Sequence, residues 1–292
     1  MISSPHTLAI VGTGRVAQAL GRLLSERGQR VVAIAGRNPE RTAHAARFIS
    51  SRTTAVAIQE IPACSSHLLI AVSDSAVECV ASLLARSGCG RGVALHTCGA
   101  KGPEALAVLG RQGISCGALH PMQSFASAEQ GIAAMAESNF AVDGDAEALE
   151  WCSSIVTLLG GRSLRIREED PSLYHTAAVM ASSYIAALIY EALEMLKAAG
   201  IERSIALSTL ALLARTCTEN SLHLGPVETL TGPIERGDST TVLAHLKCLR
   251  RFPSSVRQLY CSAGLSVVQM ALRRGLPEPK AAEIEEMLRM AQ

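Results

Sequence analysis

The chain has 292 residues, of which 48% are hydrophobic and 18% are charged. This composition excludes an intrinsically disordered chain, and the length is about twice that of a usual single domain, so two domains are expected. The formal net charge is only +1, and aromatic residues make up 3%. The chain therefore lacks both the positive charge that attracts nucleic acid and the aromatic side chains that stack on its bases. We expect no nucleic-acid partner.

The nine cysteines never lie closer than nine residues apart, so the sequence contains no C-x-x-C motif and no zinc-type spacing. We interpret them as reduced, mostly buried thiols of a cytoplasmic protein. Residues 1–7 lack the positive region of a signal peptide, and the apolar stretch 176–190 falls short of the roughly 18 residues that a membrane span needs. These observations predict a soluble cytoplasmic protein with no membrane partner.

In the first half of the chain, short apolar runs alternate with segments of helical periodicity. Continuous apolar strands separated by helices are typical of a parallel sheet covered by helices on both faces. The expected strands are residues 7–11, 31–35, 67–72, 93–95, 114–119 and 139–142, and the expected helices are 15–27, 39–50, 75–86 and 146–159. The first half is therefore predicted to be an α/β domain.

After about residue 167 the periodicity is helical nearly to the end, and no convincing strand follows. Asp170 is the expected N-cap of a first helix of about 29 residues, which ends at Gly200. Further helices are expected at residues 202–223, 240–251, 253–274 and after 279. We therefore predict an α/β domain at residues 1–166, followed by an all-α domain at residues 167–292.

A glycine-rich turn joins the first expected strand to the first expected helix, with the sequence Gly12-Thr13-Gly14-Arg15-Val16-Ala17. In a dinucleotide-binding turn the first glycine makes the bend, and the second lets a pyrophosphate approach the backbone at the helix N-terminus. The small residue at position 17 lets the helix and the strand pack closely. In this context the motif predicts a Rossmann domain whose residues 12–16 contact a dinucleotide.

The end of the second expected strand indicates which dinucleotide binds. A site for NAD(H) carries Asp or Glu there to bind the ribose 2′-hydroxyl. This chain instead has Arg37 and Asn38, with Arg41 one helical turn further on. The planar fork of a guanidinium can bind a 2′-phosphate, so we expect NADP(H) as the cofactor and favour NAD(H) less.

Polar residues follow the expected strands at their carboxyl ends, where doubly wound sheets bind ligands. The strand at 67–72 leads into Val72-Ser73-Asp74, which we expect beside the nicotinamide ribose, although an N-cap role alone would explain Asp74. His96 and His120 end the next two strands. We expect His96 to contact the cofactor and His120 to take part in catalysis, with a hydrogen-bonded structural role as the alternative for each.

Four motifs resemble those of a known group of proteins: His96-Thr97-Cys98-Gly99-Ala100, His120-Pro121-Met122-Gln123-Ser124-Phe125, Tyr174-His175-Thr176-Ala177-Ala178, and residues 231–238 with His245. The first half resembles the NADP-oxidoreductase Rossmann domain, also known in coenzyme-F420-dependent proteins, of pyrroline-5-carboxylate reductases and β-hydroxyacid dehydrogenases. The whole chain resembles bacterial proteins that join this domain to a C-terminal helical domain of unknown function. That group usually has Ser at the position of Cys98 and Asn at the position of Ser183. The resemblance implies the fold and the class of cofactor, and it leaves the reaction open.

The resemblance also implies a position for the catalytic group. In β-hydroxyacid dehydrogenases a lysine on the first long helix of the helical domain protonates the substrate, and a Glu-Ala pair and then a Gly follow at fixed distances. Glu191-Ala192 and Gly200 keep this spacing, which places His175 at the lysine position. An imidazole can donate a proton near neutral pH, so His175 is the expected proton donor, with packing at the domain junction as the alternative. Ser182 would share its helix face.

Two further chemical interpretations of these residues are disfavoured. Metal binding by His96, His120 and His175 lacks a supporting carboxylate or ligand spacing, so we expect no metal site. Cys98 could be a nucleophile, but no group nearby in the sequence activates its thiol.

The remaining polar candidates are substrate ligands. Gln123 follows His120 and would face the nicotinamide end of the site. Arg236 could bind a substrate carboxylate with both of its terminal nitrogens, and Asp238 lies in the same turn. A structural pair between Arg236 and Asp238 is the alternative.

Together these features predict an NADP(H)-dependent oxidoreductase that transfers a hydride to or from a small carbonyl, imine or hydroxy acid in the cleft between the domains. A non-catalytic NADP-binding regulator or scaffold, favoured by the missing lysine, and an F420-dependent reductase are the alternatives. The apolar helix at 176–196 offers more apolar surface than a small domain needs, so we expect a homodimer formed through the C-terminal helices. The substrate, the direction of the reaction and the pathway do not follow from the sequence.

Overall fold

The computed structural model describes residues 6–136, 138–165 and 171–292, so the expected N-cap Asp170 lies outside the described residues. The chain divides into two compact units, residues 1–183 and 184–292. Helix α8 (Pro171–Met180) belongs to the first unit by its packing, although the sequence analysis places the domain boundary after residue 166.

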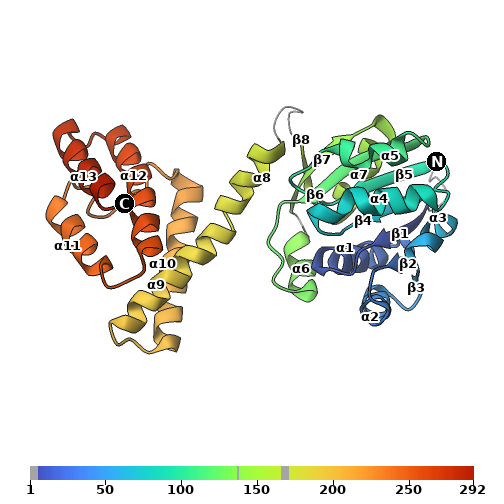
Figure 1. Cartoon of the computed structure of the whole chain (residues 1–292), viewed down its shortest axis with the longest axis horizontal. Helices are drawn as coiled ribbons and strands as arrows, with labels where there is room; N and C mark the ends of the chain where they lie inside the picture. The colour runs from blue at the N-terminus through green and yellow to red at the C-terminus, as the bar shows by residue number, and fades with distance from the viewer. Residues whose placement is uncertain (1–5, 137, 166–170) are drawn as a thin grey trace. The chain divides into compact units, whose positions relative to one another are not determined.

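An eight-stranded sheet forms the centre of the first unit, in the order β3-β2-β1-β4-β5-β6-β7-β8 (Figure 1). The strands from β3 to β6 in this order are parallel, β7 runs antiparallel to β6, and β8 runs parallel to β7. The expected, mainly parallel α/β sheet is confirmed. The strands are β1 (Thr7–Val11), β2 (Arg30–Ala35), β3 (Thr54–Val56), β4 (His67–Ile70), β5 (Gly92–His96), β6 (Ile114–Pro121), β7 (Asn139–Gly144) and β8 (Arg162–Arg165).

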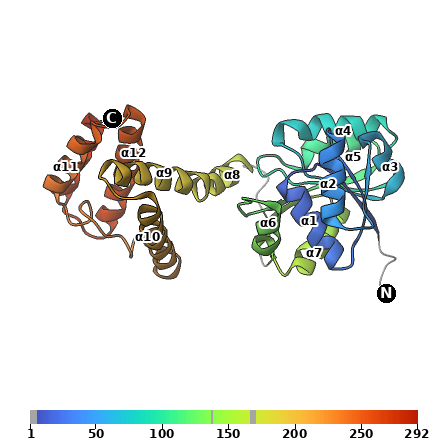
Figure 2. The ribbon, with the colours of Figure 1, turned by 90° about the horizontal axis from the view of Figure 1, so that it is seen from below.

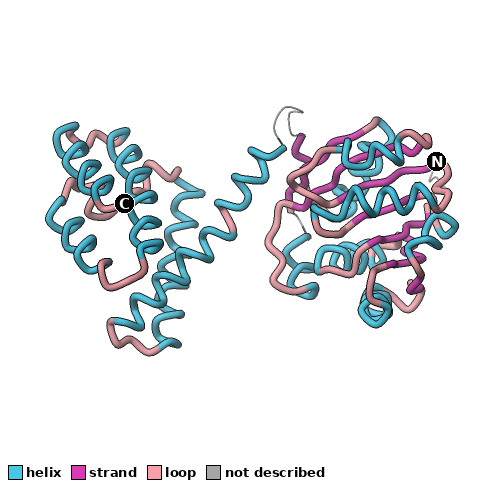
Figure 3. The backbone as a smooth tube through the Cα atoms, viewed as in Figure 1, coloured by secondary structure: helices cyan, strands magenta, loops and turns pink. Residues whose placement is uncertain are grey.

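Helices cover both faces of this sheet because successive strand residues point to opposite sides. On β1, Leu8 and Ile10 belong to the core beneath one set of helices, whereas Ala9 and Val11 belong to the core beneath the other. Figures 2 and 3 show the strands between these helical layers. The first set is α1 (Arg15–Glu26), α2 (Pro39–Ile49) and α7 (Ala146–Leu159), and the second is α3 (Ile61–Cys64), α4 (Val77–Arg86) and α5 (Ala107–Gly110). A further helix, α6 (Ala128–Met135), packs beside α1.

The structure contains two strands, β3 and β8, that the apolar pattern does not predict. Both lie at the edges of the sheet and are short, with three and four residues. All four residues of β8 are exposed. A strand that buries no side chain has no apolar run, so hydrophobic periodicity cannot detect it.

The single long helix expected from residue 171 to residue 200 is broken into α8 and α9 (Ser183–Ala198). The Ser182 hydroxyl donates to the Ala178 carbonyl at 2.7 Å, while the Ser182 amide donates to the Val179 carbonyl at 3.2 Å. The hydroxyl therefore takes the carbonyl that an α-helical amide would use, and the turn tightens at this residue.

The second unit is helical, as expected. It contains most of α9 and then α10 (Arg203–Leu224), α11 (Ser239–Leu249), α12 (Ser254–Arg273) and α13 (Glu278–Met290). Its buried core comes from the last three helices, with Val242, Val268 and Ile284 among its members. No strand occurs among residues 184–292.

One stretch, Ser172–Ala198, is long and apolar enough to cross a membrane by length and composition, with a mean hydropathy of 1.4. It extends beyond the stretch 176–190 on both sides, so the expectation that this region is too short for a span is wrong. Length and composition alone are weak evidence, because helices that pack against protein can pass the same test.

His67, on β4, packs against two other rings. Its ring centroid lies 4.3 Å from that of His6 and 4.6 Å from that of Trp151, which it meets edge to face. Burial, with a smaller contribution from the charge of His6, lowers the pKa of His67 to about 4. The folded protein therefore keeps His67 neutral at pH values where the unfolded chain protonates it.

We expect the free energy of unfolding to fall as the pH drops from about 6.5 toward 4, because the unfolded chain takes up a proton that folded His67 does not bind. This stabilisation is fully present above the unfolded pKa of 6.5, and roughly 3 kcal/mol of it is lost once the pH has fallen below about 4. Urea unfolding at a series of pH values, followed by the fluorescence of the single tryptophan, Trp151, measures this dependence. His67→Gln should reduce the dependence of the free energy of unfolding on pH. The control is His44→Gln, which replaces an exposed histidine and should leave this dependence unchanged. Equal pH profiles for the two variants would contradict the prediction.

Candidate functional site

A cleft of about 990 Å³ opens at the carboxyl ends of the parallel strands. Strand β1 lies between β2 and β4, so the sheet extends in opposite directions from this point. Doubly wound sheets bind ligands at such a switch point. Residues that follow β1, β2, β4, β5 and β6 all contribute to the lining of the cleft.

The glycine turn after β1 has the geometry that a phosphate-binding turn requires. Gly12 has a φ of +123°, and a Cβ at this position would collide with the Ala71 carbonyl. Gly14 is the N-cap of α1, and nothing lies within 4 Å of the position that its Cβ would occupy. A phosphate can therefore approach the backbone amides at this helix N-terminus. Ala17 is fully buried where the helix meets the sheet.

Most of the residues expected to bind the cofactor line this cleft. Arg37 and Arg41 are exposed there, and Asn38 holds the start of α2 by accepting a hydrogen bond from the Arg41 amide at 2.9 Å. The carboxylate in the lining is that of Asp74. The cleft can therefore hold a dinucleotide with a 2′-phosphate beside the arginines. The expected residues in its lining are Gly12, Thr13, Gly14, Arg15, Val16, Arg37, Asn38, Arg41, Val72, Ser73 and Asp74.

The contacts of His96 are those of the hydrogen-bonded structural role, the alternative to contact with the cofactor. Its side chain is fully buried and does not contribute to the lining of the cleft. Nε2 lies 2.9 Å from the Gly102 carbonyl, and Nδ1 accepts a hydrogen bond from the Cys98 amide at 3.2 Å. Both ring nitrogens therefore hold the loop after β5, and burial lowers the pKa of His96.

Asp74 lines the cleft without capping the following helix. It begins a short 3₁₀ turn, Asp74–Ala76, and the N-cap of α4 is Ala76. The N-cap role considered for Asp74 is therefore wrong, and Asp74 is one of the residues that line the cleft.

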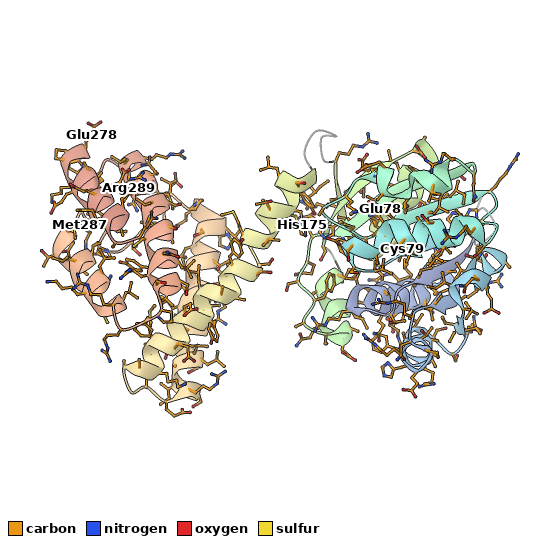
Figure 4. The ribbon with its side chains drawn as sticks, viewed as in Figure 1. Glu78, Cys79, His175, Glu278, Met287 and Arg289 are labelled. Carbon is orange, nitrogen blue, oxygen red and sulfur yellow. The ribbon has the colours of Figure 1, made fainter. Side chains whose placement is uncertain are left out.

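A cluster of three side chains lies where the cleft meets β6 and α8. The Nδ1 atom of His120 lies 2.9 Å from the Tyr174 hydroxyl, and the ring centroids of His120 and His175 are 6.0 Å apart. Gly99 lies against both imidazoles, because a Cβ there would be 2.7 Å from His120 Nε2 and 2.8 Å from His175 Cδ2. His175 is on α8, where Figure 4 labels it. The absence of a side chain at Gly99 therefore lets the two rings approach each other.

The environment of this cluster sets its protonation. Burial, reinforced by the nearby charge of His175, lowers the pKa of His120 to about 4, so the ring is neutral near pH 7. Burial raises the pKa of Tyr174 to about 12, which keeps its hydroxyl protonated. When this hydroxyl donates to Nδ1 of His120, the ring proton is on Nε2, beside Gly99. Burial also raises the pKa of Cys98 to about 11, which leaves its thiol a poor nucleophile.

A second cavity, of about 550 Å³, shares the lining residues Gly99 and His120 with the cleft. Its charged lining residues are Lys101, Glu104, Asp143 and Asp145. Each of the three carboxylates accepts a hydrogen bond from a backbone amide at 2.8–3.0 Å. The Lys101 ammonium pairs at 2.5 Å with Glu78, which lies on α4 (Figure 4). The lining therefore carries an excess of negative charge.

Four other predicted residues do not belong to the lining of either cavity. Ser182 is exposed, and its hydroxyl is bonded to its own helix. The Gln123 amide donates to the Ala134 carbonyl at 3.1 Å. Asp238 caps α11 through hydrogen bonds to the Thr241 amide and hydroxyl, at 3.0 and 2.6 Å. Arg236, which is exposed, belongs with Asp238 to the second unit.

Sequence reasoning assigned no role to Tyr174, Gly99, Thr97 or Phe125, which also line these cavities. All four belong to the motifs that contain His96, His120 and His175, so those motifs contained the signal. No group of three or more His, Cys, Asp or Glu side chains that could hold a metal ion occurs in the described ranges.

Two family models match parts of the chain. Residues 3–121 match the family model of a Rossmann-like domain, and residues 138–267 match that of a domain of unknown function, DUF2520. The chain thus carries a Rossmann-like domain followed by DUF2520. No match was found among curated protein sequences.

Several solved structures share this fold over most of their length. A protein from Bacteroides fragilis, provisionally named an NADP oxidoreductase, has a TM-score of 0.75 and 21% identity over 90% of this chain and 97% of its own. A protein from Thermotoga maritima has a TM-score of 0.69 and 23% identity over 91% of this chain and 99% of its own. Pyrroline carboxylate reductase from Plasmodium falciparum, solved with NADP bound, has a TM-score of 0.60 and 12% identity over 97% of this chain and 98% of its own. At these identities the likeness establishes the fold.

We expect Gly99→Ala to force His120 and His175 apart and to destabilise the protein by roughly 1–3 kcal/mol, because the added methyl group overpacks the cluster. The pKa of His120 should rise from about 4 toward its ordinary range as water reaches the ring. Chemical denaturation measures the first effect, and NMR titration of the histidine ring protons measures the second. Gly90→Ala is the matched control, since nothing lies within 4 Å of that Cβ position. If Gly99→Ala behaves like Gly90→Ala in both measurements, the packing described for Gly99 is wrong.

Proposed function

Proceeding from a Rossmann-like domain followed by DUF2520, we propose that this protein is an NADP(H)-dependent oxidoreductase that acts on a small carbonyl, imine or hydroxy acid. The observation that carries the proposal is one cleft lined by the glycine turn, by Arg37 and by the His120–His175 pair. Arg37 follows β2 and His120 lies on β6, four strand spacings apart in the sheet order. At about 4.8 Å per spacing this is roughly 19 Å, a span that suits an extended dinucleotide.

The residues of the cleft would hold the cofactor at three points. Arg37 and Arg41 would bind the 2′-phosphate with their guanidinium groups, and the amides at the start of α1 would bind the pyrophosphate. Ser73 and Asp74 would border the ribose next to the nicotinamide. NADPH, when bound, supplies the hydride of the reaction.

The histidine pair offers a division of roles in proton transfer. His120 is neutral near pH 7 because of its lowered pKa, so it holds no imidazolium proton to donate at that pH. We therefore assign proton donation to His175, which also lines the cleft. His120 and Tyr174 would then orient the substrate oxygen or nitrogen beside His175. Ser182 and Gln123 have no part in this scheme, because their side chains bond elsewhere.

The second cavity is the place that we propose for the substrate, because it meets the cleft at Gly99 and His120. Its carboxylates, Glu104, Asp143 and Asp145, would repel a substrate carboxylate and attract a positively charged group. An imine, which is cationic when protonated, therefore fits this cavity better than an oxo acid does. Arg236 as a carboxylate anchor stays a prediction from the sequence.

We expect the protein to bind NADPH more tightly than NADH, and Arg37→Ala to weaken NADPH binding by roughly 10- to 100-fold, because a charged hydrogen bond to phosphate is lost. NADH, which lacks the 2′-phosphate, should bind the variant and the parent equally. Nicotinamide fluorescence on titration measures all four affinities. Arg47→Ala removes an exposed arginine from the last turn of α2, the helix that follows Arg37, and serves as the control. If neither nucleotide binds the parent protein, the proposed function fails and an F420-dependent or non-nucleotide role takes its place.

We expect His175→Ala to lower kcat by roughly 100-fold or more while leaving the NADPH affinity unchanged, because the proton donor is lost and the phosphate contacts stay. The assay follows NADPH oxidation with a matched pair of substrates, a small cyclic imine and a 2-oxo acid of similar size. Turnover of the imine should exceed that of the oxo acid. Equal turnover in His175→Ala and the parent would reject His175 as the donor. NADPH binding without turnover of any carbonyl or imine would support the non-catalytic alternative.

A further inference from the structure

Four residues that line the second cavity lie on one face of the sheet. Strands β6 and β7 are antiparallel, and their register places Ala118 opposite Asp143 and His120 opposite Ala141. Alternate residues of a strand point to the same side of a sheet, and so do residues directly opposite each other across an antiparallel pair. All four line the cavity, so His120 and Asp143 form diagonal corners of a floor whose other two corners are alanines.

The two alanines leave room for a ligand on this floor. A larger side chain at either position would stand between the imidazole of His120 and the carboxylate of Asp143. Diagonal neighbours across an antiparallel pair are about 7–8 Å apart. The cavity volume of about 550 Å³ lies within the range of small-molecule sites. A small ligand on the floor can therefore contact His120 with one end and Asp143 with the other.

The Asp143 carboxylate has one oxygen free for such a ligand. Its Oδ1 atom accepts a hydrogen bond from the Gly144 amide at 2.8 Å, whereas Oδ2 has no hydrogen-bond or salt-bridge partner within the described part of the chain. The lysine in the lining, Lys101, pairs with Glu78 instead. The other two charged side chains of the lining are carboxylates as well. A cationic group on the ligand would therefore complement the free oxygen of Asp143.

We propose that Asp143 binds a primary ammonium group of the substrate that takes no part in the reaction, so that the protein acts on an imine that also carries an amino group. This inference rests on the proposed function, which puts the reacting imine beside His120 and His175. An extended chain advances about 1.2 Å per bond, so the two nitrogens would be roughly four to six bonds apart, since each lies inside the corner that binds it. One free oxygen suits the compact charge of an ammonium, whereas a guanidinium pairs best with two.

A purely structural role is the alternative for Asp143, because its bond to the Gly144 amide holds the end of β7. Asp143→Asn separates the two roles. The side-chain carbonyl of asparagine can accept the same hydrogen bond from Gly144, so the strand end keeps its contact. The negative charge is lost, so binding of an ammonium group should weaken.

The test compares small cyclic imines whose side chain ends in an ammonium, a methyl or a carboxylate group, about five bonds from the imine nitrogen. We expect kcat/KM with NADPH to be highest for the ammonium imine, roughly 10- to 100-fold above the methyl imine, and lowest for the carboxylate imine. Asp143→Asn should abolish the advantage of the ammonium imine through a higher KM, with the methyl imine unchanged. The control is Glu147→Gln, which removes an exposed carboxylate of α7 that does not line the cavity and should change none of the three values.

A second measurement needs no turnover. Calorimetric titration of the full-length protein, without nucleotide, uses the saturated amines that correspond to the ammonium and methyl imines. The diamine should bind the parent more tightly than the monoamine, and Asp143→Asn should remove this difference. Equal turnover of the two imines by the parent, or a preference that survives in folded Asp143→Asn, would overturn the role of Asp143 and leave the proposed function intact. If no imine is reduced but the diamine binds in a manner that depends on Asp143, the proposed function fails and the ammonium site stands. If the diamine has no advantage either, both fail.

Discussion

The close approach of the Gly12 backbone to Ala71 is the contact on which the cleft of the first unit depends. The Gly12 amide donates to the Ala35 carbonyl at 2.8 Å, and the Ala71 amide donates to the Val11 carbonyl at 2.8 Å. These bonds join the ends of β1, β2 and β4, and β1 is the strand from which the sheet extends in opposite directions. A side chain at position 12 would collide with the Ala71 carbonyl and would have to adopt a φ of +123°. The missing side chain therefore permits both the turn and the opening beside it.

A second glycine has a similar effect near β6 and α8. Gly99 leaves room for His120 and His175 to approach each other from β6 and α8, two elements far apart in the sequence. The surroundings then distinguish the two rings, because burial lowers the pKa of His120 to about 4 and the Tyr174 hydroxyl takes one of its nitrogens. Neighbouring groups of the same type can take different roles in proton transfer when their environments differ in this way.

The two units differ in how they are stabilised. The first unit has a core on each face of its sheet, and nearly every residue of its central strands is buried. The second unit has one core, beneath α11–α13, while α9 and α10 present leucines and tyrosines to solvent.

Local sequence was sufficient to predict much of this protein. The continuous apolar runs identify β1, β2 and β4–β7, because buried parallel strands need apolar side chains on both faces. The glycine turn and Arg37 identify the cleft, because they are contiguous in sequence with the strand ends that form it. Edge strands β3 and β8 escape such reasoning, since they bury few side chains.

Only the tertiary structure decided the roles of individual polar residues. His96 and His120 both lie at strand ends, yet the loop after β5 encloses His96, while His120 meets Tyr174 and His175. Ser182, predicted to act beside His175, instead bonds its own helix and breaks it. The sequence by itself determined the sheet, the order of the two units and the dinucleotide turn, because each depends on neighbours along the chain. The cluster at Gly99 and the cavity beside it depend on contacts between distant segments, and the fold alone determines those contacts.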